Sequence, residues 1–455
     1  MKWRSSLIYF LVLVLLGGYY YYFEVVARER NEAAERQAKR VFDIKVENIK
    51  ALEIESTDKN SVHLVKNGVW KITSPIQCEV DQTTFDGLLS TLATLEMERV
   101  VIADANDLQP YGLVTPALKI RIQQSDQAAE LVLGDTNPSG DAYYAKVGEI
   151  NDVFLVSRGV WGILNKGLNE LRRQELFSFE SQTVKGLSVV WEDGRLIEVA
   201  RHPEKDWQAA DQTGLKIKGA KVENVLDQLR WLRAAKFIEN DLSNLAKYGL
   251  AQPQVTIQVK LPDNRSVELL LGRESEEGKQ IPAVSSEIPA IVLVSTDILQ
   301  DLPASIQALQ DRSILTHKAD EVTDIEWRLG TERGHLVRMD ATRWGFFQGS
   351  GEQPLELKDS WQASSLLYDL AQAEYLQEKE PVTTPPAEPF GRLRLCNGQQ
   401  ELLSIAWQQT AENPSKPVAV WVQSGGQSPT TVAVEGELLQ RIESDLDRFR
   451  PSDGQ

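Results

Sequence analysis

The sequence predicts an α+β protein in which an N-terminal transmembrane helix is followed by three tandem repeats, each a largely antiparallel sheet with two helices. Three observations lead to this fold class. The chain of 455 residues begins with a long apolar run, one tryptophan recurs at a fixed spacing after it, and alternating apolar segments accompany each recurrence. The length alone favours about three domains of ordinary size.

The composition is that of a folded protein and argues against several classes of function. Apolar residues make up 42% and charged residues 25% of the chain, close to the averages of globular domains. The formal charge of -17 repels phosphate backbones, so we expect no nucleic-acid partner. Cys78 and Cys396 lie outside any CxxC spacing, which argues against a disulfide framework and a thiolate metal site.

Residues 7–26 form an apolar run that is long enough to span a bilayer, after a short tail at residues 1–6. We expect a membrane anchor here, with tyrosines at the lipid–water boundary. The run exceeds an ordinary signal peptide core, so we expect retention, although Val25-Val26-Ala27 resembles a processing site. The expected anchor residues include Leu7, Leu11, Leu15, Tyr19 and Tyr22.

The orientation of the expected anchor is open. Five Lys or Arg residues follow the run and two precede it, so a strict positive-inside count would keep the large domain in the cytoplasm. Long domains are translocated largely regardless of flanking charge, and we expect the repeats on the outer side. Residues 27–41 carry opposite charges at four-residue spacing, which predicts a solvated helical stalk.

Internal repetition is the most informative feature of the rest of the chain. One tryptophan recurs every 137 residues, as Trp70, Trp207 and Trp344. A Tyr-Gly-Leu segment recurs at the same offset, at residues 111–113 and 248–250, which indicates copies of one module. The third copy is the most diverged. The expected repeats span residues 42–177, 178–316 and 317–450, with a tail at residues 451–455.

Each repeat shows the same order of predicted elements. Two alternating segments are joined by a tight-turn dipeptide, Asn67-Gly68 in the first repeat and Asp193-Gly194 in the second, which predicts a hairpin. A helical stripe follows, with apolar residues at three- and four-residue intervals that we expect to lie in the core. A second hairpin, an apolar strand and a short closing helix complete the repeat. The stripes are Phe85, Leu88, Leu89, Leu92 and Leu95, then Val222, Val225, Leu226, Leu229 and Leu232, then Trp361, Leu366, Leu367 and Leu370.

Several short motifs resemble those of a known family. They are Tyr111-Gly112-Leu113, Leu133-Gly134-Asp135, Tyr143-Tyr144, a Val-Phe-Leu-Val strand and a closing Leu-Arg-Arg segment. Together with the N-terminal run they resemble the DUF4340 family of bacterial envelope proteins over nearly the whole chain. The resemblance implies an accessory of gliding-motility-type ABC transporters at the bacterial inner membrane, with its repeats in the periplasm and no assigned activity. The third repeat departs from the pattern, because Ser404-Ile405-Ala406 replaces the Leu-Gly turn.

The search for catalytic and metal-binding motifs is negative. The four histidines lack HExxH or HxH spacing, and neither GxSxG nor GxxxxGK[ST] occurs. We therefore expect no catalytic residue, no cofactor and no metal site. Aromatic side chains that stack on a ligand are the candidate binding surface. These are Tyr111, Tyr143, Tyr144 and Tyr248.

Three functions remain open at this point. The leading interpretation is a noncatalytic, membrane-anchored scaffold or binding protein of the envelope, whose linked weak sites gain effective concentration. Its partners would be the membrane and the permease or accessory subunits of an ABC transport system. The first alternative is a periplasmic glycan- or peptide-binding module. The second is an envelope hydrolase, which requires a cleft with perturbed carboxylates in one repeat.

Overall fold

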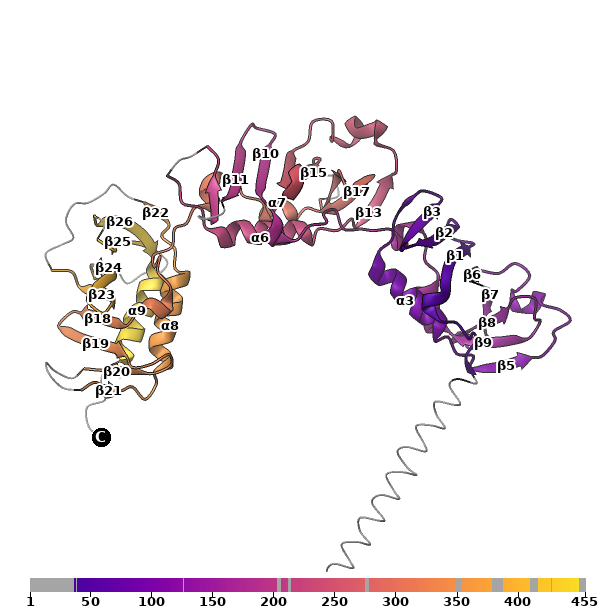
Figure 1. Ribbon diagram of the computed structural model, residues 1–455, viewed down its shortest axis with the longest axis horizontal. Coiled ribbons are helices and arrows are strands. Elements are labelled where there is room, and N and C mark those ends of the chain that lie inside the picture. Colours follow the sequence, from indigo (N-terminus) through magenta and orange to yellow (C-terminus); the bar gives the residue numbers. More distant parts are fainter. Residues whose placement is uncertain are drawn as a thin grey trace, which may run out of the picture. The chain divides into compact units, whose positions relative to one another are not determined.

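The computed structural model describes residues 37, 39–125, 127–202, 206–211, 214–274, 278–347, 353–378, 388–409, 416–426 and 428–449. These residues form three mostly antiparallel sheets, which Figure 1 colours along the chain. Contacts between residues divide the chain into two compact units. The first unit comprises Met1–Leu196 and Asn224–Leu302, and the second comprises Ile197–Glu223 and Pro303–Gln455.

The first sheet has nine strands in the order β4-β3-β2-β1-β6-β7-β8-β9-β5. Two antiparallel meanders meet at the β1–β6 pair, where Leu52 lies opposite Ile122. Gly68 makes the tight turn between β2 and β3 with a φ of 78°, a conformation that glycine adopts without a Cβ clash. The strands are β1 (Ile49–Ser56), β2 (Val62–Asn67), β3 (Val69–Ser74), β4 (Cys78–Glu79), β5 (Arg99–Ile102), β6 (Leu118–Gln124), β7 (Ala128–Thr136), β8 (Ala142–Val147) and β9 (Val153–Ser157).

The second and third sheets follow the same order. They read β12-β11-β10-β14-β15-β16-β17-β13 and β21-β20-β19-β18-β23-β24-β25-β26-β22. The second sheet contains β10 (Gly186–Trp191), β11 (Leu196–His202), β12 (Asp206–Ala209), β13 (Lys236–Glu239), β14 (Val255–Lys260), β15 (Ser266–Leu271), β16 (Gln280–Ser285) and β17 (Ile288–Ser295). The third contains β18 (Asp324–Leu329), β19 (Glu332–Arg338), β20 (Trp344–Phe346), β21 (Leu355–Glu356), β22 (Gln377–Glu378), β23 (Gly391–Asn397), β24 (Gln400–Trp407), β25 (Pro417–Ser424) and β26 (Thr430–Glu435).

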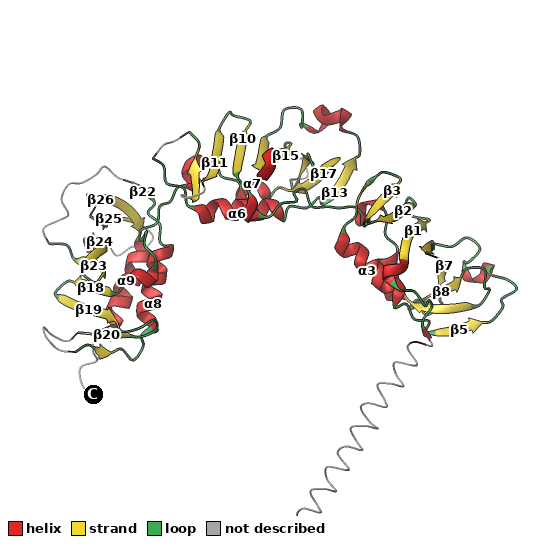
Figure 2. Cartoon of the chain, in the orientation of Figure 1, coloured by secondary structure: helices red, strands yellow, loops and turns green. Residues whose placement is uncertain are grey.

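One helix of three turns follows the first meander of each sheet, namely α3 (Gln82–Ala93), α6 (Gly219–Arg230) and α8 (Trp361–Gln372). Figure 2 shows each of them along a sheet. The Leu and Val side chains of their stripes are buried within the helices, for example Leu88 and Leu366 at 0% exposure. Leu232, which was also predicted to lie in the core, follows the end of α6 and is half-buried. Trp361, however, is 63% exposed, so its predicted place in the core is wrong. It lies five residues before Leu366, about 140° away around a helix of 3.6 residues per turn.

The predicted fold class is wrong in its helices. Two helices per repeat were expected, but the closing helix is a single turn in the first two copies, at α5 (Leu168–Leu171) and at the 3-10 turn Ile306–Leu309. Two further helices, α4 (Trp161–Leu164) and α7 (Ile298–Asp301), are equally short. The described residues therefore form mostly antiparallel sheet with few helices.

The transmembrane helix of that fold class is not among the elements of the described residues. No helix in the described ranges is long and apolar enough to cross a membrane. The longest of them, α9 (Gly436–Arg448), has 13 residues and spans about 20 Å, against a hydrocarbon core of about 30 Å. The apolar run at residues 7–26, with Leu7, Leu11, Leu15, Tyr19 and Tyr22, lies outside the described residues, as does most of the predicted stalk at residues 27–41.

The two short motifs that recur in the sequence meet in space. A Cβ on Gly134 would lie 2.1 Å from the carbonyl oxygen of Tyr111, and a Cβ on Gly272 would lie 2.5 Å from that of Tyr248. Only glycine permits such a close approach of two backbone segments. Gly112 has a φ of 66°, which is again a glycine conformation. The Tyr-Gly-Leu and Leu-Gly motifs therefore have a structural role in joining a loop to a strand.

Candidate functional site

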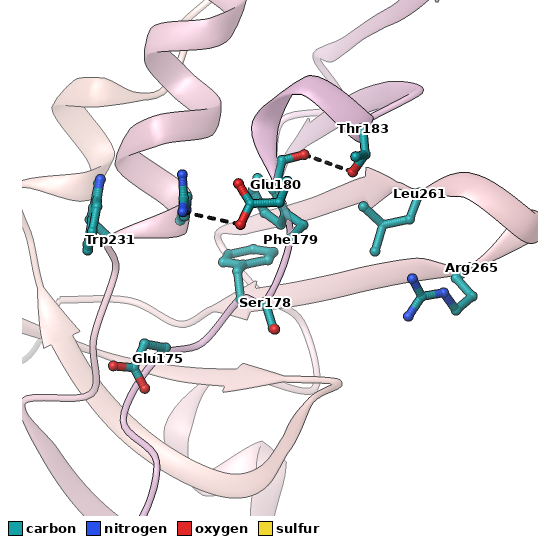
Figure 3. Close-up of a pocket in the computed structure, with 10 residues that line it drawn as sticks. Glu175, Ser178, Phe179, Glu180, Thr183, Trp231, Leu261 and Arg265 are labelled. Atoms are coloured by element: carbon teal, nitrogen blue, oxygen red, sulfur yellow. Dashed lines mark hydrogen bonds and ion pairs between the residues drawn. The ribbon is translucent and has the colours of Figure 1, made fainter. Parts of the chain in front are cut away.

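A cleft of about 460 Å³ lies in the first compact unit, where the chain enters the second sheet and passes the end of α6. It combines three aromatic side chains with six polar or charged ones, so it offers both apolar and hydrogen-bonding surface to a ligand. Figure 3 shows Trp231 at one end of the view and Arg265 at the other. The lining residues are Glu175, Phe177, Ser178, Phe179, Glu180, Thr183, Arg230, Trp231, Leu261 and Arg265.

Two buried phenylalanines form the apolar part of this cleft. Phe177 is 2% exposed and Phe179 is 8% exposed. Their ring centroids lie 5.7 Å apart at an interplanar angle of 74°, which is the favourable edge-to-face arrangement. Both precede β10, so the segment that begins the second sheet also supplies a fixed hydrophobic wall of the cleft.

Trp231 provides a large exposed surface. Its side chain is 71% exposed, and it directly follows the last residue of α6. Leu229 belongs to the buried stripe of that helix, and two further residues turn the side chain about 200° away from the sheet. Arg230 places its guanidinium carbon 5.4 Å from the centroid of the indole. The indole is thus available for stacking on a ligand.

The carboxylates of the cleft are engaged in ion pairs. The carboxylate of Glu180 accepts a hydrogen bond from Arg230 at 3.4 Å, which Figure 3 marks with a dashed line. The carboxylate of Glu175 accepts one from Arg233 at 2.5 Å. Arg265 differs, because its exposed guanidinium makes no ion pair with any residue that the structure describes. Five N–H donors in a planar fork are therefore available to a carboxylate or to hydroxyl groups.

Trp231 and Arg265 were not predicted as site residues. The sequence does contain a signal for Trp231. This tryptophan follows Leu229 by two residues, which is about 200° around the helix, so it cannot share the buried face of α6. Arg265 has no comparable signal. It ends the turn between β14 and β15, and only the folded sheet brings that turn to the cleft.

A second hollow, of about 500 Å³, lies elsewhere in the first unit and has a structural role. Its wall includes Arg172, which is 4% exposed and lies 3.2 Å from the ring centroid of Phe237. The guanidinium donates to the side-chain oxygens of Asn169 at 2.8 Å and Asn240 at 2.6 Å. Burial lowers the pKa of Arg172 to about 10, so it remains charged at neutral pH. These contacts connect the first sheet to the second.

The predicted aromatic surface lies apart from the Trp231 cleft. All four tyrosines are half-buried, and none lines the cleft. The structure brings Tyr111 and Tyr144 together at 4.9 Å, while Tyr143 stacks on Trp161 at 4.8 Å. Tyr248 donates its hydroxyl hydrogen to Glu239 at 2.6 Å. Each ring packs against its neighbours, and its role in binding stays a prediction.

Neither metal-binding clusters nor activated thiols are seen in the described part of the chain. It contains no group of three or more His, Cys, Asp or Glu side chains that could hold a metal ion. Burial raises the pKa of the Cys78 thiol to about 11 and also raises that of Cys396. Both side chains are therefore protonated thiols at neutral pH, which are weak nucleophiles.

The comparison with protein families agrees with the repeated structure. A family model with the description "Domain of unknown function (DUF4340)" matches residues 70–244 and 207–389, which together cover more than half of the chain. The chain belongs to the DUF4340 family. The two DUF4340 matches begin at Trp70 and Trp207, so the family pattern recurs with the 137-residue period of the tryptophans. None of the curated proteins matches this chain.

Proposed function

We propose that this DUF4340 protein is a noncatalytic scaffold and binding protein of the bacterial cell envelope, and that the Trp231 cleft binds a saccharide with a carboxylate group. The observation that carries the proposal is the presence of an indole at 71% exposure and the guanidinium of Arg265 in one cleft. Three sheets of like strand order support the scaffold role, since linked modules gain effective concentration.

The chemistry of the cleft favours a saccharide. An indole face packs against the apolar face of a sugar ring, and tryptophan suits surfaces that are apolar at one end and wet at the other. The planar guanidinium of Arg265 matches a carboxylate with two parallel hydrogen bonds. Ser178 and Thr183 add hydroxyl groups that suit sugar hydroxyls.

The ion pairs in the cleft favour binding over hydrolysis. A glycosidase needs one carboxyl group that is protonated near neutral pH and a second that is ionised. Glu175 and Glu180 each have an arginine partner. Both carboxylates of the cleft are therefore engaged in ion pairs, which supports the noncatalytic proposal.

Calorimetric titration of the full chain with soluble fragments of an acidic envelope glycan tests the proposal. Trp231→Ala is expected to weaken the affinity roughly tenfold, because stacking on an aromatic ring contributes about 1.4 kcal/mol. Trp361→Ala is the matched control, since Trp361 is 63% exposed on α8 and does not line the cleft.

Equal binding by both alanine variants would refute the assignment of the cleft. Arg265→Gln separates the two recognition elements, since it should weaken binding of the acidic fragment more than binding of the same fragment with its carboxylate amidated. Binding of peptides without binding of glycans would favour the peptide-binding alternative.

The proposal includes a place beside an ABC transport system at the inner membrane, on the periplasmic side. The resemblance to the DUF4340 family supports this part. Purification of the tagged full chain from gently solubilised membranes is expected to recover a permease or accessory subunit. Failure to recover any transporter subunit in several detergents would count against that association.

A further inference from the structure

The first junction between sheets is the segment at residues 171–176, which lies wholly in the first compact unit. This segment forms a β-bridge to Val80, next to the start of α3, and another from Glu175 to Arg233. Two distant side chains meet as a result. The Arg233 guanidinium lies 2.5 Å from the carboxylate of Asp81, whose side chain is only 3% exposed.

The second junction, at residues 309–314, lies wholly in the second compact unit. It also forms two β-bridges, to Ile217 on one side and from Ser313 to Glu374 on the other. The ammonium groups of Lys218 and Lys221 lie 2.8 Å and 2.6 Å from the carboxylate of Glu374. About three quarters of each of these side chains is buried.

Asp81 and Lys218 occupy equivalent positions in the two junctions. They are 137 residues apart, and the backbone N–H of each donates to a carbonyl of its junction, at 2.8 Å and 2.9 Å. Arg233 and Glu374 are equivalent too, because each forms the second bridge of its junction. Each DUF4340 match contains one such pair. The charges, however, are inverted between the two junctions.

We propose that this charge inversion fixes the order of the three sheets and prevents their similar surfaces from pairing wrongly. Asp81 of the first repeat pairs with Arg233, but beside Glu374 it would place two carboxylates together. Lys218 of the second repeat pairs with Glu374, but beside Arg233 of a second copy it would place two cations together. Like charges at a contact suppress wrong partners, and tandem modules of like fold are prone to misassembly.

Refolding of the full chain from denaturant tests the proposal. The combined variant Lys218→Asp, Lys221→Gln and Glu374→Arg keeps a pair at the second junction but makes it like the first. We expect this variant to lose native yield to soluble oligomers, measured by size-exclusion chromatography with light scattering. The control Lys218→Arg with Glu374→Asp keeps the inversion and is expected to refold like the wild type.

A rescue distinguishes lost order from a damaged junction. Adding Asp81→Lys, Arg233→Glu and Glu175→Gln to the combined variant swaps both junctions and restores the inversion with opposite signs. Glu175→Gln removes the carboxylate that pairs with Arg233 in the wild type and would otherwise face the new glutamate. Native yield is expected to recover. The proposal is overturned if the combined variant refolds with the yield and size distribution of the wild type, or if the doubly swapped variant forms as many oligomers as the combined one.

Hydrogen exchange in the native full chain gives an independent readout. Glu374→Arg alone would place a fourth cation beside Lys218, Lys221 and Arg312, whose Nε lies 3.9 Å from the Glu374 carboxylate, so the amides of residues 309–314 should lose protection. Lys218→Asp in the same chain should restore part of it. Unchanged exchange in the Glu374→Arg variant would show that this pair does not hold the junction, and the proposal would fail.

Discussion

Trp207 and Trp344 form a matched pair for measuring the contribution of one buried hydrogen bond. Both belong to the second compact unit, are 2% and 0% exposed, and lie under the guanidinium of an arginine at 4.7 Å and 4.5 Å. The Trp207 indole N–H donates to Glu223 at 2.9 Å. The buried N–H of Trp344 has no hydrogen-bond partner among the described residues. Only Trp207→Phe therefore removes a hydrogen bond.

The expected difference follows from this contrast. Replacement of tryptophan by phenylalanine removes the same volume at both positions, so most of the packing loss cancels between the two variants. A hydrogen bond to a charged acceptor contributes about 1.5–3 kcal/mol, and an unsatisfied buried donor costs about 1–3 kcal/mol. Because Glu223 is one-third exposed, we take the lower ends and expect Trp207→Phe to cost about 2.5 kcal/mol more than Trp344→Phe.

Native-state hydrogen exchange is the suitable assay, because a chain of two compact units need not unfold in one transition. The free energy of opening at the amides of β11 and β20 would be compared in the two variants. Trp361→Phe, at an exposed position, is the control and should change it by less than about 0.5 kcal/mol. An equal or larger loss in Trp344→Phe would refute the reasoning.

Three further predictions concern the cores and a junction. Phe85→Ala removes a 0% exposed ring that packs edge-on against Trp70 at 4.8 Å, so the free energy of unfolding in urea should fall by about 3–5 kcal/mol; a loss below 1 kcal/mol would contradict the packing. Gly134→Ala would force a Cβ within 2.1 Å of a carbonyl oxygen, so the melting temperature should drop, and an unchanged value would disprove the close approach. Burial would raise the pKa of Asp81, but hydrogen bonds from Thr84 and the Arg233 ion pair hold it below its usual value. That stabilisation is complete above about pH 4 and disappears as the pH falls through the lowered folded-state pKa, so Arg233→Ala should reduce the acid dependence of urea midpoints between pH 7 and pH 3.

Local patterns in the sequence predict the hairpins and the core helices well. Asn67-Gly68 requires a turn with positive φ, and Gly68 has a φ of 78°. The stripe from Phe85 to Leu92 predicts the buried face of α3, and all four of its side chains are buried. The closing helices were overestimated because Leu171 and Leu309 lead into junctions, where the backbone bridges neighbouring segments instead of continuing a helix.

The sites depend on contacts that sequence patterns do not contain. Arg265 reaches the cleft from a turn between two strands, far along the chain from Glu175. The junction pairs are separated by 152 residues for Asp81 and Arg233, and by 156 residues for Lys218 and Glu374. Charges so far apart follow no spacing rule in the sequence, and the β-bridges of the two junction segments bring them together.

The most direct test of the central claim is to incubate the full chain with an isotopically labelled acidic glycan fragment of the envelope and to measure both its retention and its mass. The proposed function predicts that the fragment is retained by the wild type and by Trp361→Ala, is bound roughly tenfold more weakly by Trp231→Ala, and is recovered with unchanged mass. Shortened products, or retention that does not depend on Trp231, would contradict noncatalytic binding at this cleft.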